Sequence, residues 1–409
     1  MSQAADADPA SGTHPYRWTM LAGVWLAYYS FGLTAVSMAP VVGVISSDLG
    51  LNYSTMGAIL GAWQLVYIGT AIPCCALLDQ IGLRRSLFLG VILVGLSGTL
   101  RAFATDEITL FLAVGLFGFG GPLISIGAPK AVSQWLGGSE RGLAMGIYMT
   151  AVAFGGISSL SLTNSVLMPA FDGAWRSVLL TYAGFVLVCA LVWLLVASHP
   201  AARVAEAQAA RVPRPPRLQV FMELVRMPAV RIIMVISIGI FFFGHALNNW
   251  LPEILRTGGM SPAQAGFWAA VPVSVGLVGA LAIPRLAVGR RRFMVLLALF
   301  LCAGTASLLL HSPPGPGLAM GLALQGLAQS SMMTVTILVL LDLPGLTASS
   351  RGLAGGLFFA TAVFGGVLGP LTVGVLSDLT GGFTAPLYLL TAVCAALMAL
   401  GLLLRRTIR

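Results

Sequence analysis

The chain has 409 residues, of which 58% are hydrophobic and only 9% are charged, and its formal net charge is +9. Soluble domains carry roughly 25% charged residues, so this composition excludes a soluble globular fold and predicts a protein whose solvent is lipid. The basic residues form short clusters between apolar runs instead of one continuous patch, which argues against nucleic-acid binding.

Apolar runs long enough to cross a bilayer follow one another along the whole chain. A spanning helix needs about 20 mostly apolar residues, and polar or Gly/Pro-bearing segments separate runs of that length. The sequence predicts twelve spanning helices, at 18–41, 55–78, 84–104, 108–136, 141–168, 174–197, 229–255, 262–288, 291–311, 317–343, 350–377 and 383–405.

The polar segments divide these helices into two sets of six. We expect a tail at 1–17, a first six-helix bundle at 18–197, a linker at 198–228, a second bundle at 229–405 and a short tail at 406–409. Asp6 and Asp8 make the first segment unlike a cationic signal peptide. Most arginines fall in the tails, the linker and the even-numbered connections, which predicts cytoplasmic termini in an inner (plasma) membrane.

The two sets are related by an internal repeat. SERGLAMGIYMTAVAFGG (139–156) aligns without gaps with SSRGLAGGLFFATAVFGG (349–366), at an offset of 210 residues. These segments begin the predicted fifth and eleventh spans, so the same offset relates the first span to the seventh. A duplicated six-helix unit follows.

A short loop motif carries a family resemblance. CALLDQIGLRR (75–85) resembles the G-x-L-x-D-R-x-G-R-[RK] loop of the major facilitator superfamily, but differs from it at Cys75, Gln80 and Leu83. The resemblance implies an all-α membrane fold of two pseudo-symmetric bundles, usually monomeric, that transports by alternating access and is not an enzyme. NNWLPEILRTGGMSPAQAG (248–266) and GLSGTLRAFA (95–104) are similar to the cyanate-permease-like branch, which is associated with small anions.

Two cations within apolar runs are candidate anion contacts. Lys130, the only lysine, lies in the predicted fourth span, roughly 12 Å from its centre, and Arg101 lies near the end of the third. Charged groups inside a membrane usually face protein or water. The alternatives are a lysine that reaches the lipid phosphates and an arginine that pairs with Asp106 or Glu107.

His245 is the titratable group closest to the middle of a predicted span. It stands beside Asn248 and Asn249, and we expect it to contact substrate or to carry a coupling proton; the alternative is a neutral histidine bonded between helices. Other polar side chains near midspan complete the candidate site: Tyr28, Tyr29, Gln64, Tyr67, Ser125, Gln325 and Gln329.

The loop motif implies a second kind of functional residue. In the family this loop latches the two bundles, so Asp79 with Arg84 and Arg85 is expected to control conformation. Arg141 and Arg351, at matching positions of the repeat, are included in the same predicted latch.

Two hypotheses for function remain. The first is a secondary transporter of a small anion, monocarboxylate or cyanate-like, with a proton as candidate coupling ion. The second is a multidrug/proton antiporter, which commonly needs a central acid that this sequence lacks at midspan. A transporter-like sensor without turnover is a third reading. The five cysteines lie in apolar runs without metal-ligand spacing, and no phosphate-binding loop is present, so we expect no metal, cofactor or ATP.

Overall fold

The computed structural model describes residues 14–138, 140–202, 222, 224–289, 291–343, 346 and 348–408. Most of the expected linker and of the first tail, together with the last residue, lies outside the described residues. Within the described chain, every long element is a helix, and twelve of the helical segments are long and apolar enough to cross a membrane. The predicted all-α fold of twelve spans is confirmed.

The described residues of the first six spans form eight α-helices, the 3-10 turn η2 (Ala39–Val41) and a π-helical turn. Their bounds are α1 (Arg17–Val36), α2 (Val42–Leu49), α3 (Tyr53–Ile81), α4 (Leu83–Ala102), α5 (Glu107–Trp135), α6 (Glu140–Leu162), η3 (Thr163–Leu167), α7 (Met168–Ala170) and α8 (Trp175–Ala197). The first span is longer than predicted, because a short 3-10 turn around Pro40 joins α1 to α2. Proline lacks a backbone N–H, so it interrupts the helix without ending the span.

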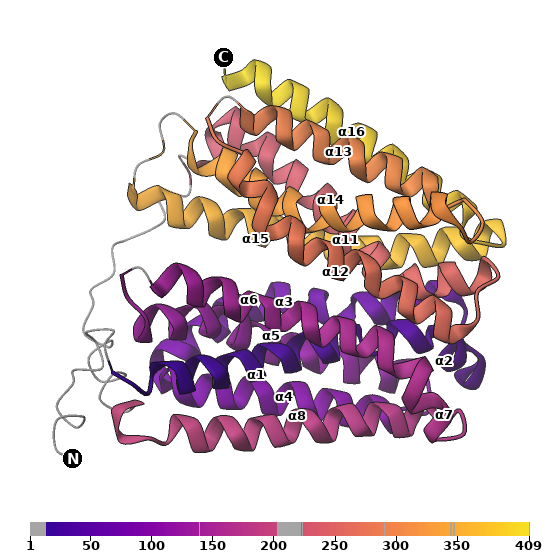
Figure 1. Ribbon diagram of the computed structural model, residues 1–409, viewed down its shortest axis with the longest axis horizontal. Coiled ribbons are helices and arrows are strands. Elements are labelled where there is room, and N and C mark those ends of the chain that lie inside the picture. Colours follow the sequence, from indigo (N-terminus) through magenta and orange to yellow (C-terminus); the bar gives the residue numbers. More distant parts are fainter. Residues whose placement is uncertain are drawn as a thin grey trace. The chain divides into compact units, whose positions relative to one another are not determined.

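The second six spans are single helices. They are α11 (Pro228–Thr257), α12 (Pro262–Leu286), α13 (Arg291–Leu309), α14 (Pro316–Leu341), α15 (Ala348–Thr380) and α16 (Thr384–Ile408). In Figure 1, α13 lies alongside α14 and α16. Capping boxes start α5 and α12: Asp106 accepts from the Thr109 N–H, and Ser261 accepts from the Gln264 N–H. Each box satisfies backbone donors that the first turn leaves unpaired.

By internal contacts the chain forms two compact units. Unit 1 holds the described residues of Met1–Val41 and Leu65–Arg214, and unit 2 holds those of Val42–Gln64 and Pro215–Arg409. The start of α3 therefore belongs with the second half of the chain, where Gly57 and Gly61 meet the backbone of α15 at Pro370 and Val367. The expected domain boundaries, at 197 and 229, stay a prediction.

The repeated Phe-Gly-Gly sequence brings helices into close contact in both units. A Cβ at Gly155 of α6 would clash with the Tyr29 carbonyl oxygen of α1. A Cβ at Gly365 of α15 would likewise clash with the Ile238 carbonyl oxygen of α11. Gly155 and Gly365 are 210 residues apart, so the repeat places a glycine at the same helix crossing in each unit.

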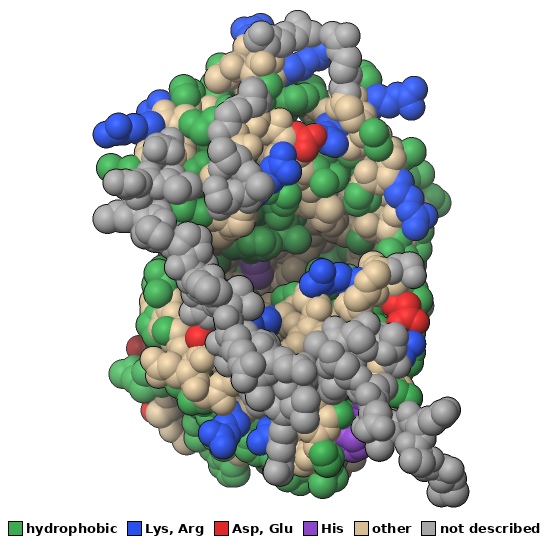
Figure 2. Space-filling model, turned by 90° about the vertical axis from the view of Figure 1, so that its left-hand side faces the viewer, with side chains coloured by type: hydrophobic (Ala, Val, Ile, Leu, Met, Phe, Trp, Pro, Cys, Tyr) green, Lys and Arg blue, Asp and Glu red, His purple; other side chains and the backbone are tan. Residues whose placement is uncertain are grey.

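Each unit has two ends. We call the end where α1 begins in unit 1, and where α16 finishes in unit 2, the termini end; the opposite end is the far end. Figure 2 looks onto the end where α13 begins and α16 finishes, and Lys and Arg side chains gather there. The described arginines of the far ends are Arg101, Arg176 and Arg256.

Candidate functional site

Six of the predicted site residues form one polar cluster in unit 2. They are carried by α11, α14 and the start of α3, and are Gln64, His245, Asn248, Asn249, Gln325 and Gln329. Gln64, Asn249 and Gln325 are buried, whereas His245, Asn248 and Gln329 are half-buried. We call this set the midspan cluster.

His245 is held by an amide and two aromatic rings. Its Nδ1 lies 3.1 Å from Gln64 Nε2. An amide nitrogen only donates, so with this arrangement Nδ1 accepts, and the neutral ring carries its proton on Nε2. The rings of Trp63 and Phe241 lie with their centroids 5.8 and 5.5 Å from that of the imidazole. The imidazole therefore has a fixed orientation beside an apolar surface.

The other amides of the midspan cluster bond to one another or to the backbone of α11. Gln329 donates to Asn248 Oδ1 at 2.7 Å and approaches the Gly244 carbonyl at 3.5 Å. Asn249 donates to the His245 carbonyl at 2.8 Å. Within the part of the chain that the structure describes, two buried oxygens of the cluster, Gln64 Oε1 and Gln325 Oε1, have no hydrogen-bond partner. Unpaired buried amide groups are costly, and at a functional site they can be reserved for a ligand.

In unit 1 the structure brings together only some of the predicted residues. The hydroxyls of Tyr67 and Ser125 lie 2.9 Å apart. Tyr28 contacts the rings of Phe31 and Tyr148, and Tyr29 stacks on Trp25. These aromatic neighbours were not singled out from the sequence, because an aromatic residue in an apolar run gives no signal of its own.

Arg101 is buried and has no carboxylate partner among the described residues. It is 2% exposed, and its Nη1 donates to the Thr34 carbonyl at 2.9 Å and lies 3.4 Å from Ser37 Oγ. Its guanidinium lies over the Phe117 ring, while its Nε has no hydrogen-bond partner in the described structure. The alternative of an ion pair with Asp106 or Glu107 is wrong. Arg101 instead satisfies a carbonyl in the last turn of α1, where the helix dipole favours a cation.

Lys130 pairs with the acid of the loop motif. Its Nζ lies 2.9 Å from Asp79 Oδ1, and its side chain is 45% exposed. The two residues come from the ends of α5 and α3, and therefore meet at the termini end of unit 1. This pair joins two predictions that the sequence kept separate: a substrate cation and a latch acid. The role of Lys130 as a substrate contact stays untested.

The other predicted latch residues also lie at the termini ends of their units, where α4, α6 and α15 begin. Arg84 approaches the Ala197 carbonyl of α8 at 3.3 Å, and Arg141 lies 3.4 Å from the Ser133 carbonyl. Arg85 and Arg351 are exposed. One ion pair of this end was missed: Arg17 with Glu140, at 2.9 Å, which ties the start of α1 to the start of α6.

A second polar group lies at the far end of unit 2. Glu253 is 3% exposed and accepts hydrogen bonds from the Tyr53 hydroxyl and from Arg256. Asp378 of α15 accepts from the backbone N–H groups of Tyr53 and Ser54 at 3.1 and 2.6 Å. Sequence reasoning missed this group, because its members lie up to 325 residues apart.

The chemistry of the described residues is that of recognition. Among them, no group of three or more His, Cys, Asp and Glu side chains could hold a metal. Every described acid of a spanning helix lies within a few residues of the helix end, as Asp79, Glu253 and Asp378 do. At midspan the described polar groups are therefore amides, hydroxyls and one imidazole.

The model of the Major Facilitator Superfamily matches residues 20–318 and 246–409. The chain belongs to this superfamily. It is an integral, multi-pass membrane transporter and not an enzyme. The resemblance seen in the loop motif is confirmed at the level of the superfamily.

Curated relatives include transporters with different cargo. The chain is 25% identical to the uncharacterized transporter YycB of Bacillus subtilis, over 93% of this chain and 92% of the relative. It is 24% identical to the 4-hydroxybenzoate transporter PcaK of Pseudomonas aeruginosa, over 66% of each. It is 34% identical to a quinolone resistance transporter of Acinetobacter baumannii, over 39% of this chain and 36% of the relative.

Solved structures share the fold. A bacterial homolog of the human lysosomal transporter Spinster, in an inward-facing and unoccupied conformation, matches with a TM-score of 0.75 and 17% identity. The match covers 97% of this chain and 98% of that one.

Proposed function

We propose that the protein is a secondary transporter that moves a small organic anion together with a proton, and that the midspan cluster contacts this cargo. The observation that carries the proposal is a cluster of amides around a single imidazole, with no carboxylate at midspan among the described residues. Amide N–H groups donate hydrogen bonds to a carboxylate, and His245 supplies the titratable group.

Charge balance supports coupling to a proton. A neutral cluster in a low-dielectric interior holds an uncompensated anion poorly, because the anion loses its hydration. A proton on His245 supplies the compensating charge. The site then binds the anion and the proton together, which is the requirement for symport.

Gln64 suits this exchange of protonation states. In the neutral state its Nε2 donates to His245 Nδ1, and its Oε1 is buried without a partner. When Nδ1 gains a proton, a rotation of the amide by about half a turn presents Oε1 as the acceptor. Gln64 can therefore stabilise both states of the ring.

Arg101 and Lys130 take other roles in this proposal. Arg101 stabilises the end of α1 and gives unit 1 a fixed positive charge, while Lys130 belongs to the latch with Asp79. The arginines of the termini ends support cytoplasmic termini. We keep monomer as the proposed state.

Export of a drug is the competing function. The identity to a quinolone resistance transporter favours it. The midspan cluster favours an anion, because a cationic drug needs a nearby acid, and the described acids of the spans lie at helix ends.

Flux measurements separate the two functions. Purified protein in liposomes is offered labelled 4-hydroxybenzoate or a labelled organic cation that carries no carboxylate, with and without an imposed proton gradient. We expect the gradient to drive uptake of the carboxylate, and His245→Gln to reduce it at least tenfold. The matched control is His311→Gln, which changes a histidine beyond the end of α13. Gradient-driven transport of the organic cation alone, or 4-hydroxybenzoate uptake that His245→Gln leaves intact, would refute the proposal.

A further inference from the structure

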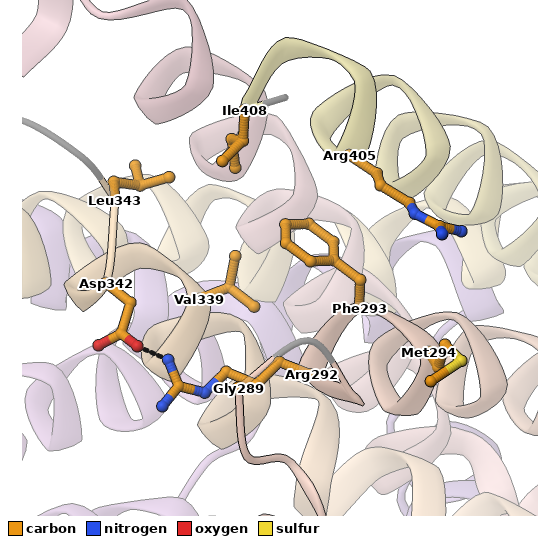
Figure 3. Close-up of a pocket in the computed structure, with 9 residues that line it drawn as sticks. All are labelled: Gly289, Arg292, Phe293, Met294, Val339, Asp342, Leu343, Arg405 and Ile408. Atoms are coloured by element: carbon orange, nitrogen blue, oxygen red, sulfur yellow. Dashed lines mark ion pairs between the residues drawn. The ribbon is translucent and has the colours of Figure 1, made fainter.

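A cavity of about 630 Å³ opens at the termini end of unit 2, away from the midspan cluster. It lies where α13 begins and where α14 and α16 finish (Figure 3). Its lining residues are Gly289, Arg292, Phe293, Met294, Val339, Asp342, Leu343, Arg405 and Ile408. The transport proposal gives this cavity no role.

The cavity has an apolar middle and two charged edges. In Figure 3, Phe293 lies between the ion pair of Arg292 with Asp342 and the side chain of Arg405. The carboxylate of Asp342 offsets Arg292. Arg405 has no hydrogen-bond or ion-pair partner among the described residues, so the lining keeps one uncompensated positive charge. Such a lining fits an amphipathic anion.

An exposed apolar stripe starts in this cavity. Met294 is 57% exposed, and Leu301 and Leu308 of the same helix are 63% and 49% exposed. Residues seven apart return to the same face of a helix, so these three form one line along α13. In a membrane-spanning helix such a line contacts acyl chains, which indicates how an occupant of the cavity would be oriented.

We propose that this cavity binds the headgroup of an anionic phospholipid, with the phosphodiester at Arg405 and an acyl chain along Met294, Leu301 and Leu308. A free anion would use the guanidinium but not the stripe. The neighbouring arginines of this end add a general attraction for anionic lipid, whereas Arg405 is the one unpaired cation among the described lining residues.

Lipid-dependent stability tests the proposal. The full-length protein is placed in nanodiscs of phosphatidylcholine, with or without phosphatidylglycerol, and its melting temperature and bound lipid (native mass spectrometry) are measured. We expect phosphatidylglycerol to raise the melting temperature and to be retained by the protein. Arg405→Gln should weaken retention about fivefold.

The neighbouring arginine provides the matched control. Arg406 is exposed and does not line the cavity, so Arg406→Gln should keep the preference for phosphatidylglycerol. Arg405→Lys, which keeps the positive charge, should keep most of the preference for phosphatidylglycerol. This variant shows whether the loss in Arg405→Gln comes from the charge or from a folding defect.

Three results would overturn the assignment. The first is equal loss in Arg405→Gln and Arg406→Gln, which would indicate a diffuse surface attraction. The second is the same stabilisation by inorganic phosphate in phosphatidylcholine discs, which would indicate a headgroup-sized anion site. The third is retention of phosphatidylethanolamine equal to that of phosphatidylglycerol, which would indicate that the cavity does not select a net negative headgroup.

Discussion

The termini ends of the two units carry the same kind of ion pair with the charges exchanged. In unit 1 the helix α5, the fourth span, supplies the cation Lys130, and its partner Asp79 lies near the end of α3, the second span. In unit 2 the helix α14, the tenth span, finishes at the acid Asp342, whose partner Arg292 begins α13. Each pair therefore joins the fourth span of its half to a residue beside the connection between the second and third spans, but from opposite sides of that connection and with the charges exchanged.

This comparison explains the only lysine of the chain. Lys130 was a candidate for a substrate cation because a lone ammonium in an apolar run needs a reason to be there. Its ion pair with Asp79 supplies one, and a comparable pair, Arg292 with Asp342, lies at the same end of unit 2. Paired charges that recur at the same end of both units favour a structural or conformational role.

The largest effects are expected where the two units are most alike. Gly155→Ala and Gly365→Ala should each destabilise the protein by about 3 kcal/mol, because each added Cβ meets a backbone carbonyl that cannot move away. Thermal unfolding followed by tryptophan fluorescence measures this. Gly146→Ala and Gly356→Ala, on the same two helices, have open space and should be neutral or stabilising. Unequal effects of the two tight glycines would break the parallel between the units.

The far ends of the two units differ in how they hold an arginine: Arg101 in unit 1 is buried and bonds to a backbone carbonyl, whereas Arg256 in unit 2 pairs with Glu253. Arg101→Gln should cost roughly 2 kcal/mol, because it removes a charged hydrogen bond to the end of α1 and a contact with Phe117. Arg256 is 44% exposed and pairs with an acid, so Arg256→Gln should cost less. Chemical denaturation in detergent measures both. Equal losses of unfolding free energy in the two variants would contradict the expectation that the buried Arg101 contributes more than the exposed, paired Arg256.

The two capping boxes should respond differently to pH. Ser261→Ala should cost about 1 kcal/mol at any pH, since a hydroxyl does not titrate. The backbone N–H of Thr109 holds the pKa of Asp106 below its ordinary value. The stabilisation from Asp106 is then complete above the ordinary carboxyl pKa and is lost as the pH falls through the lowered one. Asp106→Asn should therefore reduce the stability lost on acidification, and an unchanged pH profile would contradict this.

The smallest effect tests the exchanged ion pairs directly. Asp79→Lys and Lys130→Asp should each reduce transport, and the double variant should recover most of it, because the pair is restored in the polarity of unit 2. The stability coupling should be about 0.5 kcal/mol, because Lys130 is partly exposed. A double variant no better than the single ones would show that the sign of each charge matters.

Much of the fold followed from the sequence, since the length of each apolar run and the internal repeat can be read directly from the order of the residues. The candidate site followed in part: the amides around His245 were identified one by one, but their grouping depends on tertiary packing. The pairing of Asp79 with Lys130 was not predicted, and neither was the membership of Val42–Gln64 in the second unit. Both depend on contacts between residues far apart in the chain, which one sequence does not reveal.

Proton movement during anion binding tests the central claim most directly. Protein-containing liposomes with an internal pH dye, and no initial gradient, receive 4-hydroxybenzoate from outside. The account predicts acidification of the lumen that depends on the anion and that His245→Gln abolishes. A protonophore should dissipate the acidification, which confirms that the dye reports protons in the lumen. Anion entry without acidification, or acidification that persists in His245→Gln, would contradict it.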